Sequence, residues 1–211
     1  MVNWYDRKPG RALSNHEVAP LNQREISISR ISSHSLCVKK DYLTDATIRI
    51  SKCSDVRFYF CGSIKNVLVD SCHSCTLIFS AVSSIVKIND SHNCTIIAGA
   101  RLVHISNTVD CKCECNFSLW VFIKTVTKLV HISVFIATPM RPILTGPNKN
   151  LEIGPFNTNY NNIEADVTRA GLSIHPNNWN DPLIVESNEN TSWKFFPTED
   201  FFFHAIPYDV R

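Results

Sequence analysis

This chain of 211 residues has little net charge and no long uninterrupted apolar run. A net charge of +2 gives the whole molecule no drive toward nucleic acid or acidic lipid. Residues 1–23 are polar and lack the apolar core of a secretory signal. The most apolar stretch, Leu119–Ala137, is interrupted by Lys124, Lys128 and His131, so it predicts strands rather than a membrane span.

Windows with helical periodicity are absent from the middle of the chain, where short repeats stand instead. Four stretches superimpose at steps of 19, 19 and 17 residues: Ile48–Phe60, Val67–Phe79, Val86–Ala98 and Val103–Cys115. Within each stretch apolar and polar residues alternate at period two, which is typical of a half-buried strand. A repeat this short cannot bury its apolar side alone, so neighbouring repeats must stack around a shared interior.

The aligned repeats form apolar columns that predict which side chains face that interior. The columns are Ile48, Val67, Val86 and Val103; Ile50, Val69, Ile88 and Ile105; the small residues Cys53, Cys72, Ser91 and Thr108, where each coil bends; Val56, Cys75, Cys94 and Cys111; and Phe58, Leu77, Ile96 and Cys113. The pattern predicts an all-β fold, a right-handed parallel β-helix.

Nine cysteines raise the question of a metal site or disulfides. Cys72 and Cys75 have zinc-ligand spacing, but a zinc site usually needs two such pairs of closely spaced ligands. Every cysteine in the four repeats falls on an inward column, where a reduced thiol packs as a small hydrophobe. We therefore expect core cysteines, no bound metal and no cofactor, and a reducing compartment.

The repeats divide the chain into three parts. We expect an N-terminal arm at residues 1–25, a β-helix domain at 26–185, and an aromatic-rich tail at 186–211 that docks on its own domain or on a partner. A weaker coil precedes the clear ones if Ile31 aligns with Ile50 and Cys37 with Val56. Helical spacing at about 160–171, ending at Gly171, predicts a short helix that caps the open end of the stack.

After these repeats come three phrases: Thr138–Gly146 (TPMRPILTG), Leu151–Tyr160 (LEIGPFNTNY) and Ala170–Asp181 (AGLSIHPNNWND). Together with the cysteine-containing repeats, these three motifs resemble the tubulin cofactor C family, also called the C-CAP/cofactor C-like domain. The resemblance covers roughly residues 45–185. The resemblance implies a β-helix closed by a helix, and it is carried most specifically by Arg141, Pro142, Asn157, Tyr160, Asn178 and Trp179. Residues 116–133 depart from the family pattern as an insertion, either an extra coil or a sequence artefact; the phrase LVHIS at 102–106 returns at 129–133.

Two members of this family, tubulin-folding cofactor C and the retinitis pigmentosa protein, are GTPase-activating proteins. They present an arginine that follows two glutamines on an outward strand position. In this chain the matching stretch is Arg101–His104, so the finger position holds His104, and Arg101 and Leu102 stand at the glutamine positions. Histidine is shorter and largely neutral at pH 7, so it cannot replace a permanently charged guanidinium. Parity places His104 outward and Arg101 on the opposite strand face, unless a turn intervenes.

The chain therefore resembles most the branch of the family without a finger, the TBCC domain-containing proteins. The resemblance implies a non-catalytic, cytoplasmic protein of the cytoskeleton at the centrosome, basal body or cilium, with tubulin, microtubule or ciliary proteins as partners and a role in organelle positioning. The alternatives are a GTPase-activating protein for tubulin or an Arf-like small GTPase and, more remotely, an actin-monomer binder. No lipid anchor is expected, because Val2 follows Met1 and the first cysteine is Cys37.

The candidate binding residues form one outward column, Arg49, Leu68, Lys87 and His104, which is either an interaction stripe or a solvated face. The motif residues have structural interpretations. Arg141 is expected to support a coil end through hydrogen bonds, and Trp179 and Asn178 are expected to pack in the cap.

Overall fold

The structure is a computed structural model. It describes residues 5–6, 18–22, 25–39, 43, 45–116, 120–124, 131–146, 150–159, 164–165, 168, 171–172, 176–185, 192–201 and 204–205. The strands are β1 (Tyr5–Asp6), β2 (Val18–Asn22), β3 (Glu25–Ser29), β4 (Ser35–Lys39), β5 (Ala46–Ser51), β6 (Arg57–Asp70), β7 (Thr76–Asn89), β8 (Thr95–Ser106), β9 (Cys111–Asn116), β10 (Trp120–Lys124), β11 (Ile132–Ile136), β12 (Ile143–Thr145), β13 (Leu151–Pro155), β14 (Thr158–Asn159), β15 (Leu183–Val185), β16 (Trp193–Phe195) and β17 (His204–Ala205). A 3-10 turn, η2, covers Thr198–Asp200.

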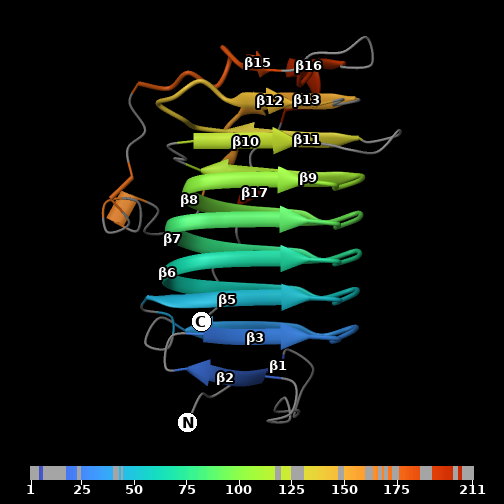
Figure 1. Cartoon of the computed structure of the whole chain (residues 1–211), viewed down its shortest axis with the longest axis vertical. Coiled ribbons are helices and arrows are strands. Elements are labelled where there is room, and N and C mark those ends of the chain that lie inside the picture. Colours follow the sequence, from blue (N-terminus) through green and yellow to red (C-terminus); the bar gives the residue numbers. More distant parts are fainter. Residues whose placement is uncertain are drawn as a thin grey trace.

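The chain winds into a stack of parallel coils, each with two strand faces (Figure 1). Face A contains β3, β5, the C-terminal halves of β6, β7 and β8, then β10, β12 and β15. Face B contains β4, the N-terminal halves of β6, β7 and β8, then β9, β11, β13 and β16. The predicted parallel β-helix is confirmed.

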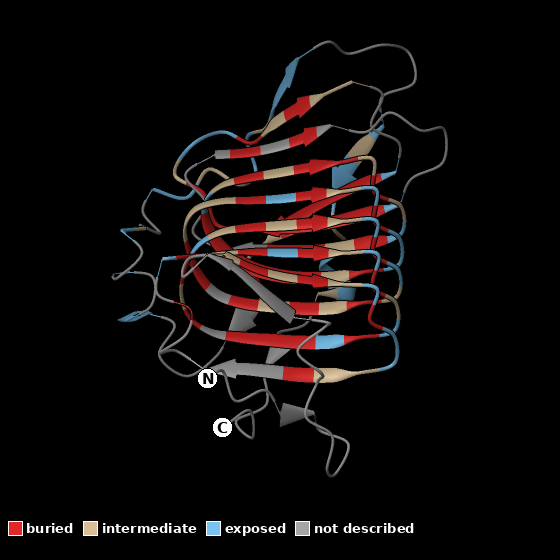
Figure 2. Ribbon diagram, turned by 60° about the horizontal axis from the view of Figure 1, so that its bottom comes forward, coloured by how far each residue is buried: buried red, intermediate tan, exposed pale blue. Residues whose placement is uncertain are grey.

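The predicted inward columns lie in register from coil to coil. Ile48 pairs with Val67, Val67 with Val86, and Val86 with Val103, and all four are buried. Their side chains belong to one continuous core with the other columns, which Figure 2 shows as alternating red positions along the strands. The cysteines of these columns, Cys53, Cys72, Cys75, Cys94, Cys111 and Cys113, are free thiols buried in this core.

The turn from face A to face B has the same geometry in successive coils. Positive φ occurs at pairs of residues three apart: Arg30 and Ser33, Lys52 and Asp55, Ser71 and Ser74, Asp90 and Asn93, and Asn107 and Asp110. Asn and Asp tolerate this region better than most residues. Between the residues of each pair one side chain turns inward: Ile31 in the first turn and the small residues of the third column in the other four. Bridges such as that of His73 with His92 join the turns of adjacent coils.

The opposite corner, from face B to face A, explains why the repeat step shortens from 19 to 17. Between β7 and β8 the register shifts twice, between Phe79 and Ala81 and again between Val82 and Ile85. The two shifts remove two residues from the corner of β8. Arg101 lies at this corner and is exposed. Its neighbour Leu102 is also only partly buried, so the two residues do not alternate between outward and inward positions. The exception that the prediction allowed therefore applies: the corner interrupts the alternation and leaves Arg101 exposed instead of inward.

The coil before the clear repeats is present, but its predicted alignment is wrong. Ile28, rather than Ile31, pairs with Ile50. Ser35 pairs with Arg57, which places His34 rather than Cys37 opposite Val56. The step here is 22 residues, so a search at a constant step of 19 misaligns it. Before this coil, β2 and β1 of the predicted arm pair antiparallel with β3 and β4.

The segment at 116–133 contributes an additional coil. β10 pairs with β8 on one side and β12 on the other, and β11 pairs with β9 and β13. The recurring phrase LVHIS marks no structural equivalence. Ile105 lies on face A opposite Ile123, whereas Ile132 lies on face B opposite Cys111.

The predicted capping helix is not confirmed. Of residues 160–171, the structure describes Glu164, Ala165 and Thr168 as helical, and all three are exposed. Their helical segment lies beside the stack in the view of Figure 1 rather than over its end. Within the described residues, no helix has the length and hydropathy needed to cross a membrane.

In the described part of the aromatic tail, β16 continues face B beside β13, and Phe196 and Phe201 pack on the outer side of that face. Phe135 is buried although its strand neighbours Val134 and Ile136 take the inward positions, and its ring contacts Phe196 and Phe201, with centroids 4.8 and 6.3 Å away. Gly154 lies opposite Phe135, and a Cβ there would approach that ring to 3.0 Å. The tail docks on its own domain, and the glycine gives it room.

Candidate functional site

The four residues predicted as a stripe lie on one line across face A. Arg49 pairs with Leu68, Leu68 with Lys87, and Lys87 with His104 in consecutive parallel registers. Their neighbours in sequence are buried, whereas Arg49 and Lys87 are exposed and Leu68 and His104 half-buried. The stripe is thus a geometric feature of the surface; its role in binding remains a prediction.

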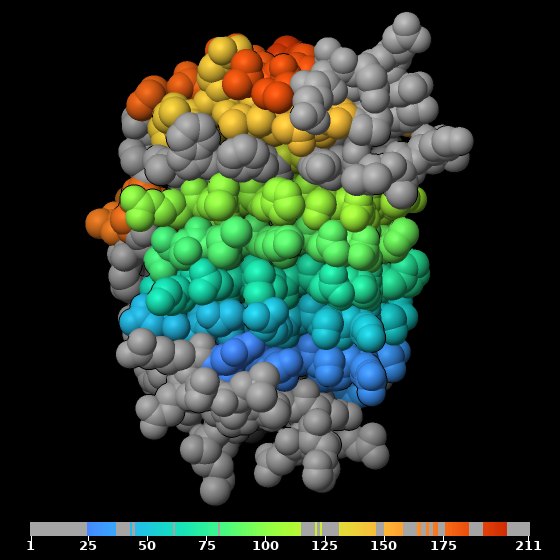
Figure 3. Space-filling view, in the orientation of Figure 1, coloured from blue at the N-terminus to red at the C-terminus, as the bar shows by residue number. Residues whose placement is uncertain are grey.

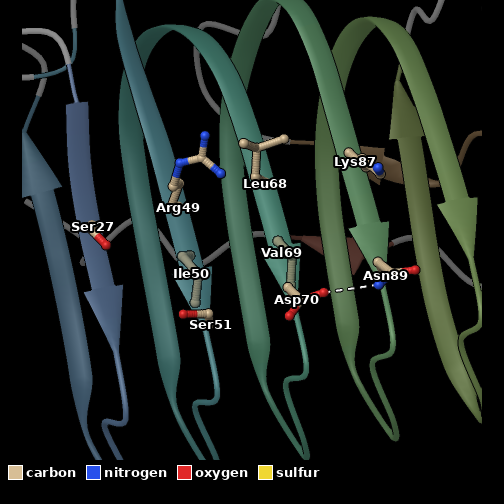
Figure 4. A pocket seen from close by; sticks show the side chains of 9 residues that line it. All are labelled: Ser27, Arg49, Ile50, Ser51, Leu68, Val69, Asp70, Lys87 and Asn89. Carbon is tan, nitrogen blue, oxygen red and sulfur yellow. Dashed lines mark hydrogen bonds between the residues drawn. The ribbon is translucent and has the colours of Figure 1, made fainter.

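A shallow groove of about 350 Å³ follows this stripe. Its rim is drawn in Figure 4, where Arg49, Leu68 and Lys87 form one row and Ser51, Asp70 and Asn89 a second row beside it. Ser27 of β3 lines the groove as well, and in the three coils of β5, β6 and β7 the groove presents two cations around one apolar side chain.

The second row is a ladder of hydrogen bonds that fixes the groove's polar edge. Asn89 Nδ2 donates to Asp70 Oδ1 at 2.9 Å, and Ser106 Oγ donates to Asn89 Oδ1 at 2.9 Å. Ser71 Oγ also donates to Asp70, at 2.9 Å. The Asp70 carboxylate is thus engaged within the protein and contributes less to what the groove can offer a partner.

The motif phrases at 138–146 and 170–181 bind each other directly. Thr138 N donates to Asn177 Oδ1 at 3.0 Å, and Asn178 N donates to Thr138 O at 2.7 Å. Asn178 Nδ2 also donates to Pro139 O, at 2.6 Å. These hydrogen bonds join two segments that are 39 positions apart in the sequence.

Arg141 and Pro142 extend this connection toward the last coil. Arg141 Nε and Nη2 donate to the backbone and carboxylate of Asp181, each at 3.1 Å. Pro142 O accepts a hydrogen bond from Leu183 N at 2.7 Å, next to the start of β15. The geometry is that of a residue holding a coil end, although both Arg141 and Asp181 are exposed and such a pair stabilises little by itself.

The remaining motif residues lie near the end of the core. Trp179 packs against the main core and meets Phe195 edge to face, with ring centroids 5.6 Å apart. Asn157 is fully buried. Tyr160 lies outside the described residues.

A tubulin binding cofactor C family model matches residues 45–130 and 125–183, which together cover more than half of the chain. The chain belongs to this family. The two matched stretches meet just after β10 of the additional coil, where the family pattern is interrupted.

Curated relatives carry the name TBCC domain-containing protein 1. The chain is 25% identical to that of Xenopus tropicalis over 206 residues, 27% to that of Xenopus laevis and 23% to that of Homo sapiens. In each case the match covers 97% of this chain and about a third of the relative. The chain therefore spans about a third of the length of the curated relatives it matches.

The resemblance places the finger motif at Arg101–His104, and the structure places this stretch at the start of face A. Leu102 and His104 lie in the outward registers of face A, opposite Ile85 and Lys87, as parity predicted for His104. Arg101 is displaced to the corner. A guanidinium is therefore absent from the stripe position where the resemblance places the finger.

A charged cluster on face B gave no signal in the sequence analysis. Glu152, 9% exposed, lies 3.1 Å from Lys194 Nζ and 3.4 Å from His131 Nε2, and accepts a hydrogen bond from Ser133 Oγ at 3.1 Å. Burial by itself raises the pKa of Glu152, but the bonds from Lys194 and Ser133 and the nearby His131 hold it below its ordinary value. Only the register of β11, β13 and β16 brings these residues together, so a motif search could not find them.

Among the residues that the structure describes, no group of three or more potential metal ligands is close enough to hold an ion. The expectation of no metal stays a prediction.

Proposed function

We propose that this chain is a non-catalytic binding module of the cytoskeleton, which uses face A to dock a tubulin or microtubule-associated protein. The family is named for tubulin binding, and the matched relatives are TBCC domain-containing proteins. The observation that carries the proposal is His104 in line with Arg49, Leu68 and Lys87, because a half-buried imidazole replaces the guanidinium on an otherwise intact outward face.

The resemblance further supports a cytoplasmic location at the centrosome, basal body or cilium, and a role in positioning organelles. Because the chain spans about a third of its curated relatives, these properties are proposed for the protein that contains the module.

Face A suits a protein partner better than face B. Phe196 and Phe201 cover Phe135 on face B, whereas the stripe on face A is open to solvent along its groove. Central interface residues combine apolar and cationic character, and Leu68 between Arg49 and Lys87 offers both.

The alternative function is a GTPase-activating protein with a degenerate site. The feature in its favour is the exposed guanidinium of Arg101, three residues before His104. Rates of GTP hydrolysis with tubulin and with an Arf-like GTPase distinguish this function from the binding module.

Binding is tested by co-sedimentation of the purified chain with assembled microtubules, and by size exclusion with tubulin dimer. A Leu68→Asp, Lys87→Glu variant should bind at least about tenfold more weakly, because it places carboxylates at the centre of the stripe. Arg57→Glu is the matched control for Lys87→Glu alone, since Arg57 is exposed on face B and the two single substitutions make the same change in charge. Equal weakening by Arg57→Glu, or no binding by the native chain, would contradict the proposal.

A further inference from the structure

The groove on face A has an unbalanced set of charges. Two carboxylates lie on this face among the described residues around the groove, and both accept hydrogen bonds within the protein: Glu25 from Arg49 Nε at 2.6 Å, and Asp70 from Asn89 and Ser71. Lys87, by contrast, is exposed at the groove and forms no ion pair with the residues that the structure describes.

Two further cations extend the same side of the molecule. Lys65 and Arg101 are both exposed, and both lie at the corner that leads into face A, two coils apart. Neither has an ion-pair partner among the described residues. Asp45, exposed at the same corner just before β5, is a third carboxylate, so the four cations Arg49, Lys65, Lys87 and Arg101 outnumber the carboxylates by one, although the chain as a whole has a net charge of only +2.

Arg49 remains available despite its contact with Glu25. That contact occupies Nε, one of five N–H donors of a guanidinium. The Arg49 side chain is 54% exposed and that of Glu25 28%, so the pair is a surface ion pair that contributes little and opens at low cost.

The geometry points to an acidic, extended segment of a protein partner as the occupant of this groove. The segment would place carboxylates at Arg49 and Lys87 and an apolar side chain on Leu68 between them. The inference rests on the proposed function in that it names the kind of segment that face A receives.

The spacing of the coils fits such a segment. Arg49 and Lys87 are two register steps apart, which corresponds to about 10 Å along the stack. A segment in the extended polyproline II conformation advances about 3.1 Å per residue with three residues per turn, so acidic residues three positions apart would lie on one side and meet both cations.

Other polyanions fit the surface less well. Proteins that bind nucleic acid through the backbone neutralise about six to ten phosphates, more than the four exposed cations described above, Arg49, Lys65, Lys87 and Arg101, supply. A flat bilayer reaches protruding surfaces first, whereas Arg49 and Lys87 line a hollow together with Leu68.

Fluorescence anisotropy with a labelled, glutamate-rich peptide that carries one central phenylalanine tests the inference. The counterpart peptide has glutamine in place of every glutamate. We expect the native chain to bind the glutamate peptide at least about tenfold more tightly than the glutamine peptide, with affinity that falls as salt rises above about 0.1 M. Lys87→Glu should weaken this binding about tenfold, whereas Arg57→Glu on face B should leave it unchanged.

Equal binding of the two peptides would overturn the inference. So would an equal loss of affinity for the glutamate peptide in Arg57→Glu and Lys87→Glu. So would binding of single-stranded RNA or phosphatidylserine vesicles without binding of the peptide. Thermal melts of both variants confirm that the fold is kept.

If the stripe variants lose microtubule binding but the peptide does not bind, the acidic-segment inference fails and the docking face stands. If the peptide binds at Lys87 but microtubules do not, the inference stands and the proposed partner fails.

Discussion

His104 stands directly opposite Lys87 in the parallel ladder between β7 and β8, at the end of the column that begins with Arg49. This register makes the finger position part of a continuous outward surface. What the position can do therefore depends on its side chain and not on whether a partner can reach it.

The assignment of inward and outward positions predicts unequal effects of one substitution at adjacent residues. Ile88→Asp should abolish cooperative folding, since an unpaired carboxylate in the core costs several kcal/mol. Lys87→Asp should leave the melting temperature almost unchanged, because Lys87 is exposed. Thermal melts measure both, and similar tolerance of the two substitutions would contradict the assignment.

The contact between Gly154 and Phe135 predicts a coupling on face B. Gly154→Val should destabilise the protein by about 1–3 kcal/mol, because its Cβ meets the Phe135 ring at 3.0 Å and Phe196 Cβ at 3.2 Å. In a Phe135→Ala background the same valine should cost clearly less. Urea unfolding of the four proteins measures the coupling, and strictly additive effects would show that the two residues do not crowd each other.

The cluster around Glu152 predicts a dependence of stability on pH. The folded pKa of Glu152 is lowered, so its contribution is present above the unfolded pKa of about 4.3 and is lost as pH falls through the folded value. Glu152→Gln should therefore lower the free energy of unfolding at neutral pH. In acid, the free energy of unfolding of this variant should decrease less steeply than that of the native chain. Parallel acid unfolding curves for the two proteins would show that Glu152 does not contribute.

The cysteine columns predict a protein without bound metal. Purified chain should contain no stoichiometric zinc, and a chelator should not change its melting temperature, because the described thiols are packed within the core. Elemental analysis checks this. One zinc per chain, lost on Cys72→Ser, would contradict the core-packing interpretation.

The parts of the fold that follow from local alternation could be predicted from the sequence. The columns of Ile48 and Ile50 and the outward position of His104 follow from period two within repeats that align at steps of 19, 19 and 17 residues. The coil of Ile28 is misaligned because its step is 22, and the exposed position of Arg101 follows from two register shifts at its corner, which alternation alone does not reveal. Tertiary contacts such as those of Glu152 or Phe135 join segments with no shared pattern, so no local rule could reveal them.

The proposal that this module does not catalyse hydrolysis is tested most directly by single-turnover GTP hydrolysis. Tubulin and an Arf-like GTPase would each be measured with saturating native chain and with His104→Ala. We expect that neither the native chain nor His104→Ala accelerates hydrolysis more than a few-fold. A finger arginine raises the rate of hydrolysis by about three to five orders of magnitude, and a histidine lacks the permanent charge of its guanidinium. A roughly hundredfold stimulation by the native chain that disappears in His104→Ala would contradict the account and make this chain a GTPase-activating protein.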